Sequence, residues 1–332
     1  MNLSRTRKGG ALALIAVIAL ITSSCSQGGA PKNNSSGGSG GSGAGDNSGY
    51  TLAMVTHETP GDTFWDKIKA GAQQAAKNEG VTLKYSNDPD PSKQATLIQN
   101  AIDSKVDGIA TTLATPDALA GSVAAANKAG IPVVAFNSGI DQYKKTGASM
   151  YFGSDENLAG ATAGQRLAAA GSKHPLCVIQ AAGSVALEAR CAGVKTKVPG
   201  TENIQVNGAD DSAVTSSLQA KLSQDKSIDS IVTLGAPIAL DAIKAKDQAN
   251  SSAKLITFDL NTDAAQDIKD GKIEFSIDQQ PYVQGFLAIT ALYLNIKNGN
   301  DMGGGGPVLT GPSFVDKTNI DKILPFAQKN TR

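Results

Sequence analysis

The sequence predicts an α/β protein in which two doubly wound, parallel-sheet lobes follow one another along the chain. Its 332 residues suffice for roughly two domains of ordinary size. Apolar residues make up 40% and charged residues 18% of the chain, which is typical of a globular protein. From residue 50 onward, apolar strand-like runs alternate with helical patterns. This alternation predicts parallel sheets with helices on both faces.

The charge balance and the histidine content exclude several classes of function. The chain has 30 basic and 30 acidic residues, so it carries no electrostatic footprint for nucleic acid. Its two histidines leave little room for a histidine-rich metal site. The acidic segment 87–90 lacks the ligand spacing of a calcium loop. We therefore expect neither a metal nor an organic cofactor.

The first 24 residues have the pattern of a secretion signal. Arg5, Arg7 and Lys8 precede an apolar run over 11–21, and small residues lead up to Cys25. The apolar run is shorter than the roughly 20 residues that a membrane span needs. Cys25 directly after the cleavage position is similar to a bacterial lipobox, in which it would be lipidated and would anchor the protein to the outer face of the cell membrane. The alternative is an ordinary secretory signal with an incidental cysteine.

Residues 25–49 consist mainly of Gly, Ser and Asn and predict a flexible tether, because such a segment cannot bury a core. Two series of strands follow. The first series covers 51–57, 81–86, 107–113 and 131–137, with helical patterns over 62–78, 91–104 and 116–129. The second series covers 176–182, 203–208, 230–235, 254–259 and 272–278. Two such series predict one lobe each.

Ligands of doubly wound sheets bind beyond the carboxyl ends of the strands, so the residues after each strand are the candidate site. These residues combine carboxylates, amides, one guanidinium and adjacent aromatic rings. Planar polar groups can hydrogen-bond neighbouring hydroxyls in pairs, and aromatic faces can cover the C–H face of a sugar. A phosphate would need more positive charge, and a hydrophobic ligand would leave the carboxylates unpaired. The pattern therefore favours a polyhydroxylated ligand.

Six segments carry a family resemblance over residues 50–332. They are DTFWDKIKAGAQQAA (62–76), VDGIATTLATPDAL (106–119), GIPVVAFNSG (130–139), LEARCAGVK (187–195), LITFDLN (255–261) and FSIDQQPYVQG (275–285). In this order they resemble the type I periplasmic sugar-binding proteins, the ribose- and galactose-binding group that serves ABC importers. The resemblance implies two lobes that are joined by three crossovers and close around a sugar.

The resemblance also implies a set of ligand-binding residues. These are Asp62, Phe64, Trp65, Asn137, Arg190, Asp259 and Gln279. Each also has a purely structural interpretation, such as a helix N-cap for Asp62 or a hinge contact for Gln279. A second group lies near the expected cleft and comprises His57, Glu58, Thr112, Asp211 and Gly235.

Three departures from the family pattern make ribose a doubtful ligand. Asn137-Ser138 stands where ribose binders often have Asp-Arg, and Gly235 stands in place of an asparagine. The loop over 56–61 is longer than in close ribose binders. A hexose, a polyol or an inositol fits the remaining groups.

The resemblance predicts lobe boundaries and partners as well. The first lobe is expected over 50–152 and 280–305, and the second over 153–279 and 306–332. The expected partners are a small sugar or polyol and the permease subunits of an ABC transporter, with the chain itself a monomer.

The remaining cysteines, Cys177 and Cys191, are candidates for a disulfide because an extracytoplasmic compartment is oxidising. Cys177 lies in a predicted strand and Cys191 in the helix that follows it, which could bring the two within reach. The alternative is a pair of buried free thiols.

Three other functions remain to be weighed against solute import. A secreted carbohydrate-active enzyme lacks support, because there is no H-E-x-x-H, no P-loop, and no nucleophile elbow outside the tether. A sugar-responsive repressor would need an N-terminal helix-turn-helix. A receptor for a sugar-like signalling molecule would share the same fold, and the sequence does not separate it from an importer component.

Overall fold

The computed structural model describes residues 48–332. The predicted signal, Cys25 and nearly all of the predicted tether lie outside these described residues. Among the residues that are described, no helix is both long and apolar enough to cross a membrane.

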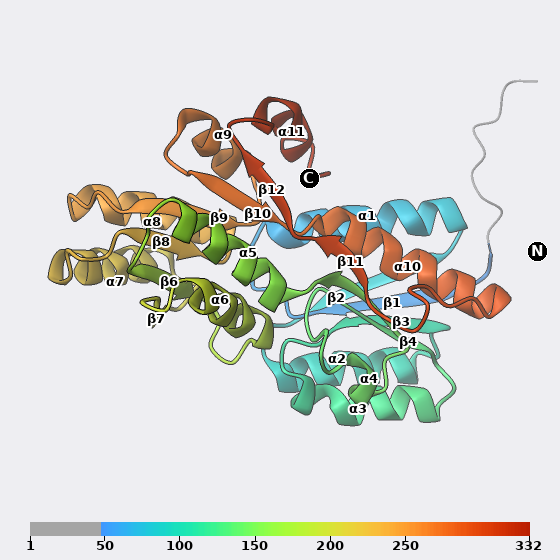
Figure 1. Cartoon of the computed structure of the whole chain (residues 1–332). Helices are drawn as coiled ribbons and strands as arrows, with labels where there is room; N and C mark the ends of the chain where they lie inside the picture. The colour runs from blue at the N-terminus through green and yellow to red at the C-terminus, as the bar shows by residue number, and fades with distance from the viewer. Residues whose placement is uncertain (1–47) are drawn as a thin grey trace, which may run out of the picture. The chain divides into compact units, whose positions relative to one another are not determined.

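The described chain contains two six-stranded sheets, which we call the sheets of the first and the second lobe (Figure 1). The first sheet has the spatial order β11 (Val308–Gly311), β5 (Met150–Ser154), β4 (Val133–Phe136), β3 (Gly108–Thr112), β1 (Thr51–Thr56) and β2 (Thr82–Asn87). The second has the order β12 (Ser313–Asp316), β10 (Phe275–Asp278), β9 (Lys254–Phe258), β8 (Ser230–Thr233), β6 (Pro175–Ile179) and β7 (Glu202–Gln205). All neighbouring strands are parallel except β10 and β12. This is the predicted fold class.

Helices cover both faces of each sheet, as the mainly apolar inner strands require. In the first lobe, one face packs against α1 (Phe64–Glu79) and α10 (Pro281–Asn298). The other packs against α2 (Pro91–Asp103), α3 (Pro116–Lys128) and α4 (Tyr143–Thr146). In the second lobe, α5 (Glu156–Ala169) and α6 (Val185–Lys197) cover one face. The other face packs against α7 (Asp211–Gln224), α8 (Ala236–Gln248), α9 (Thr262–Asp270) and α11 (Ile320–Ala327).

The chain passes between the two sheets three times, after β5, after β10 and between β11 and β12. The third crossing lies at residues 311–313, later than the expected boundary at 305/306, because β11 pairs with β5 of the first sheet. The glycine tract over 303–306, which resembles a linker in sequence, contains three glycines with positive φ and turns the chain into β11. Likewise, β5 extends to Ser154, beyond the expected boundary at 152/153.

Glycines permit the close approach of α5 and α6, the helix pair that positions Arg190. A Cβ atom on Gly160 of α5 would collide with the backbone carbonyl of Arg190, and one on Gly193 of α6 would collide with the backbone of Asn157. The absence of a side chain at both positions therefore allows the backbones of α5 and α6 to touch, and this contact positions Arg190 on α6.

A disulfide joins Cys177 of β6 to Cys191 of α6, so the free-thiol alternative does not hold. Both cysteines are fully buried within the apolar cluster that α5 and α6 form against the second sheet. The bond ties the helix that carries Arg190 to its own sheet.

Candidate functional site

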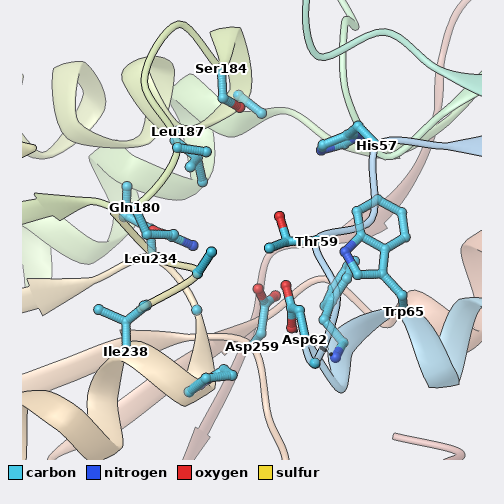
Figure 2. A pocket seen from close by; sticks show the side chains of 18 of the residues that line it. His57, Thr59, Asp62, Trp65, Gln180, Ser184, Leu187, Leu234, Ile238 and Asp259 are labelled. Carbon is cyan, nitrogen blue, oxygen red and sulfur yellow. Dashed lines mark hydrogen bonds between the residues drawn. The ribbon is translucent and has the colours of Figure 1, made fainter. Parts of the chain in front are cut away.

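A cavity of about 510 Å³ lies at the carboxyl ends of the strands and is lined by residues of both lobes (Figure 2). Its volume is in the range of small-molecule sites. All seven residues that the family resemblance implies line it, as do His57, Asp211 and Gly235 from the second group. Their position on the cavity wall is an observation, and their contact with a ligand stays a prediction.

Glu58 and Thr112 do not line the cavity, contrary to their place among the candidates. The Glu58 carboxylate accepts a hydrogen bond of 2.6 Å from the hydroxyl of Tyr85, which draws it toward β2. Thr112 is fully buried beneath the loop that follows β1. Each contacts the residues behind the wall instead of the cavity itself.

Aromatic side chains form the first-lobe wall. Phe64 and Trp65, at the start of α1, are both more than nine-tenths buried, and their rings meet edge to face with centroids 5.3 Å apart. The His57 ring stands edge to face against Trp65 at 4.8 Å. Both of these adjacent aromatics line the cavity. Trp65 and His57 project from the same side of the cavity (Figure 2).

The hydrogen bonds around Thr112 fix the tautomer of His57. The Thr112 hydroxyl oxygen accepts from the backbone N–H of His57 at 3.2 Å and from Nε2 of Gln94 at 3.1 Å. A hydroxyl has two lone pairs and one proton, so the proton remains for Nδ1 of His57, 2.7 Å away. The hydroxyl therefore donates to Nδ1, and the ring proton of the neutral imidazole resides on Nε2. Burial lowers the pKa of His57 to about 4, so the ring is neutral at physiological pH.

Asp62 lies on the loop that leads into α1 and lines the cavity next to this wall. One of its carboxylate oxygens accepts a hydrogen bond of 3.0 Å from the backbone N–H of Phe64. Burial raises the pKa of Asp62, while this hydrogen bond and the nearby Lys67 lower it. The N-cap position of α1 is held by Thr63, so the N-cap interpretation of Asp62 does not hold. The carboxylate instead stabilises the turn that leads into α1, and its second oxygen stays available at the cavity.

The second-lobe wall carries a buried chain of charges. Nε of Arg190 donates to Glu156 at 2.6 Å, Nη1 donates to the carbonyl of Leu234 at 3.0 Å, and Nη1 lies 3.7 Å from Asp259. The guanidinium also stacks 4.7 Å from the centre of the Phe258 ring. The two carboxylates share this one guanidinium, and all three side chains are buried.

Burial raises the pKa of Asp259 to about 7, against the opposing effects of Arg190 and of a hydrogen bond from Gln279. Burial also raises the pKa of Glu156, whose second oxygen has no hydrogen-bond partner among the described residues. The arrangement can accept hydrogen bonds from hydroxyls at Asp259 while Arg190 offsets the charge.

Gln279 connects the two lobes at the crossover after β10. Its Nε2 donates to Asp259 of the second lobe at 2.8 Å, and its Oε1 accepts from Nδ2 of Asn137 of the first lobe at 3.2 Å. Gln284 supports it, with Nε2 donating to the Gln279 side-chain oxygen at 2.9 Å. The hinge interpretation of Gln279 therefore holds, and its contact with a ligand stays a prediction for an amide that also lines the cavity.

Three non-glycine residues around this junction have left-handed backbone conformations. Asn137 has φ of 64°, Asp259 of 66° and Gln280 of 57°. Such conformations cost energy in residues with a Cβ atom and persist where the surroundings enforce them, often at functional sites. They turn the side chains of Asn137 and Asp259 away from the sheets and into the cavity.

Several lining residues escaped the sequence interpretation, among them Gln180 after β6 and Leu234 and Ile238 on either side of Gly235. Ser184, Leu187 and Asp210 also line the cavity and lie in segments after strands that were expected to form the site. The strand before Gln180 was expected to run to residue 182, whereas β6 ends at Ile179. A polar residue that interrupts an apolar run was the available signal for Gln180.

One cluster outside the cavity has side chains of the metal-binding type. His174, Glu202 and Asp225 lie close together on the second lobe. Lys221, however, lies 2.8 Å from Glu202 and 3.7 Å from Asp225, so an ammonium already balances both carboxylates. This arrangement gives no support for a metal there.

Comparison with known proteins places the chain in a family. The family model described as the periplasmic binding protein domain matches residues 52–301. A carbohydrate transporter from Acidothermus cellulolyticus 11B, solved in complex with myo-inositol, is 54% identical, with a TM-score of 0.84 over 85% of this chain and 99% of that one. An ABC transporter solute-binding protein from Burkholderia graminis C4D1M, in complex with D-arabinose, is 25% identical, with a TM-score of 0.75 over 83% of this chain and 98% of that one.

Curated relatives agree with the structural neighbours. The xylose/arabinose-binding protein XylF of Sulfolobus acidocaldarius is 27% identical over 83% of this chain and 73% of its own length. The ribose import binding protein RbsB of Haemophilus influenzae is 28% identical over 72% of this chain and 82% of its own length.

The chain therefore belongs to the periplasmic binding protein family, among the sugar-binding solute-binding proteins of ABC transporters. This is an extracytoplasmic family whose members bind solutes and are not enzymes.

Proposed function

We propose that this protein binds myo-inositol, or a cyclic polyol very similar to it, and presents it to the permease of an ABC importer. The observation that carries the choice is the 54% identity to a carbohydrate transporter in complex with myo-inositol, over nearly the whole length of that chain. That relative exceeds the pentose-binding relatives in identity by a wide margin. A polyol is also one of the ligands that the sequence pattern favours.

The charges of the cavity support a neutral polyhydroxylated ligand. Arg190 is the cation of the second-lobe wall, and Glu156 and Asp259 already balance it. An anionic ligand would therefore bring an unbalanced charge into a buried site, which is costly. A ring of hydroxyls can instead donate to Asp259 and accept from Nε2–H of His57, while Trp65 covers a C–H face.

The proposed mechanism is closure of the two lobes around the solute, without covalent chemistry. Ligand contacts with both lobes favour the closed state because they exist only when both walls touch the ligand. His57, Asp62, Trp65 and Asn137 would provide the first-lobe contacts. Arg190 and Asp259 would provide those of the second lobe, and Gln279 would join the two sets at the hinge. The closed protein would then dock on the permease.

We also propose that Cys25 carries a lipid that holds the protein at the outer face of the membrane. The basic residues, short apolar run and small residues that precede Cys25 support this proposal. Metabolic labelling with a radioactive fatty acid would test it, since a Cys25→Ala variant should incorporate no label.

A thermal-shift screen would test the proposed ligand. Purified, ligand-free protein should melt at a higher temperature in the presence of myo-inositol, because a ligand that binds only the native state stabilises it by mass action. The panel should include other inositols, pentoses, hexoses and amino acids. A shift only with pentoses or hexoses would overturn the inositol proposal and keep the importer role. A shift with none of these solutes, from folded protein, would favour a receptor for a signalling molecule.

A further inference from the structure

We propose that Gln180 is a specificity-determining residue that hydrogen-bonds a hydroxyl of the bound solute from the second-lobe wall. We further propose that residue 235 is glycine because the Gln180 amide needs the space beside it. The proposal rests on the proposed function in one respect, namely that the solute is a polyol. It concerns a pair of residues on neighbouring strand ends, after β6 and after β8.

The side chain of Gln180 is held at the cavity without a partner of its own. It is half-buried and lines the cavity, and Figure 2 shows its amide projecting into the space opposite His57 and Trp65. Its side-chain oxygen is buried and makes no hydrogen bond within the described residues. Buried polar groups in native proteins nearly always have a partner, so this amide has unused hydrogen-bonding capacity at the wall of the cavity.

The backbone of Gln180 is held in place, which sets the point on the wall from which its side chain extends. Its carbonyl accepts a hydrogen bond of 3.0 Å from the N–H of Gly208, on the loop before α7. A Cβ atom on Gly208 would lie 2.7 Å from Cβ of Gln180, closer than real atoms approach. Gly208 thus allows the loop to pack directly against Gln180.

Gly235 is adjacent on the other side, and its backbone does not require glycine. Its φ is −165°, an extended conformation that any residue adopts. The atom that a Cβ on Gly235 would approach most closely is Nε2 of Gln180, at 3.0 Å. The feature that a side chain at 235 would disturb is therefore the position of the Gln180 amide.

The chemistry of the amide suits a polyol. A primary amide both donates and accepts, so it can bind two neighbouring hydroxyls or one hydroxyl in both roles. The surrounding wall, formed by Leu187, Leu234 and Ile238, is apolar. A solute with a hydroxyl at that edge would gain a hydrogen bond, whereas one with hydrogen there would leave the amide unpaired. Gln180 would thereby select for hydroxylation at a defined ring position.

The main test compares Gln180→Leu with a matched control. Leucine keeps most of the side-chain volume and removes the amide. Gln205→Leu changes the same residue type at the end of β7, next to β6, where the side chain is exposed and outside the cavity. By calorimetry with myo-inositol, we expect about a tenfold loss of affinity for Gln180→Leu, as for the loss of one net hydrogen bond. We expect no change for Gln205→Leu. Equal affinities for Gln180→Leu and the wild type would overturn the proposal.

Monodeoxy-inositols would identify the hydroxyl of the solute that hydrogen-bonds Gln180. One analogue, which lacks the hydroxyl that contacts Gln180, should bind the wild type about tenfold more weakly than myo-inositol. The same analogue should bind Gln180→Leu as well as myo-inositol does. If every analogue loses the same factor in both proteins, Gln180 contacts none of the hydroxyls and the proposal is wrong.

The role of Gly235 has a separate test by a double-mutant cycle. Gly235→Ala should weaken binding in the wild type, because it displaces the amide. It should have no further effect in the Gln180→Leu background. Additive losses would show that residue 235 acts independently of Gln180.

Failure of the proposed function is distinguishable from failure of this inference. If myo-inositol does not bind the wild type and another sugar of the panel does, the proposed function fails. The comparison of Gln180→Leu with Gln205→Leu is then made with that sugar, and the same tenfold criterion decides the role of Gln180.

Discussion

Asn137 in the first lobe and Asp259 in the second occupy equivalent positions with different chemistry. Each follows a phenylalanine that ends a strand, each has a positive φ, and each backbone N–H donates to a carbonyl of the neighbouring strand. The first lobe has an amide at this position and the second a carboxylate. Gln279 hydrogen-bonds both side chains, so one residue on the hinge contacts the two equivalent groups.

The two lobes also differ in the buried ion pairs that they carry at the cavity. Arg190, Glu156 and Asp259 all belong to the second lobe, whereas the first lobe contributes the carboxylate of Asp62, neutral His57 and aromatic rings to the wall and, within the described residues, no cation. A buried ion pair that loses one partner is strongly destabilising. Because all three charged partners belong to one lobe, closing and opening of the lobes does not separate them.

The largest expected effect comes from removing the central cation of the second lobe. Arg190→Ala would leave Glu156 and Asp259 buried without a counter-charge, so the free energy of unfolding should fall by about 3–5 kcal/mol. Urea unfolding measures it. As a control, Lys269→Ala breaks the exposed pair with Asp321 and should leave stability unchanged. An Arg190→Ala protein as stable as the wild type would show that the pair contributes nothing.

The second largest effect is expected from reduction of the disulfide, which only the second lobe contains. The Cys177–Cys191 bond, with a sequence separation of 14, lies in the second lobe, and the first lobe contains no cysteine. Reduction should lower the free energy of unfolding by about 3 kcal/mol. Amide hydrogen exchange should accelerate in β6 and α6 and stay unchanged in β1 and α1. Equal acceleration in both lobes would contradict the local role of the bond.

The third largest effect concerns the affinity for the solute when Asn137 or Asp259, the two equivalent residues, is replaced. A hydrogen bond to a charged group is worth more than one between neutral groups. At a pH above 7, where Asp259 is ionised, we therefore expect Asp259→Asn to weaken solute binding at least about a hundredfold, and Asn137→Ala about tenfold. Calorimetry on both variants decides the ranking. The reverse order would mean that the first lobe, without a net charge at this position, dominates recognition.

The smallest effect is expected in the pH dependence of stability, to which His57 and Asp259 contribute with opposite signs. Below its ordinary pKa of 6.5, the unfolded chain protonates His57 while the folded protein stays neutral down to about 4, so this group makes stability rise with pH over that window. Above the ordinary 3.8, the unfolded chain ionises Asp259 while the folded protein keeps the proton up to about 7, so this group makes stability fall with pH.

Replacing His57 or Asp259 should remove the contribution of that residue to the slope of the free energy of unfolding against pH. This contribution is at most about 1.4 kcal/mol per pH unit. The slope of stability between pH about 4 and about 6.5 should become more negative in His57→Gln and more positive in Asp259→Asn. Urea unfolding at a series of pH values would show both. Identical slopes in the two variants would contradict the assigned environments.

Much of the fold follows from local patterns in the sequence. The helix expected over 62–78 is α1, and the one expected over 116–129 is α3, each within two residues at either end. The strands β5, β11 and β12 were not predicted. All three are short strands on the hinge side of the sheets. β11 pairs with β5 and β12 with β10, so each joins its own sheet beside a strand from another part of the sequence, and no alternating pattern marks it.

The site residues also divide into those that the sequence could predict and those that it could not. Residues that follow well-marked strands, such as Asn137 and Asp259, could be predicted because strand ends converge in a parallel sheet. Gln180 was missed because the end of its strand was placed three residues too late. Glu156 and Thr112 act through Arg190 and His57, and such roles depend on tertiary contacts that no sequence spacing encodes.

The most direct test of the account is a calorimetric titration of the ligand-free wild type and Asp259→Asn with myo-inositol. We expect saturable one-to-one binding to the wild type and binding at least about a hundredfold weaker to the variant. Equal affinities for the two proteins, or no heat of binding to folded wild type, would contradict it.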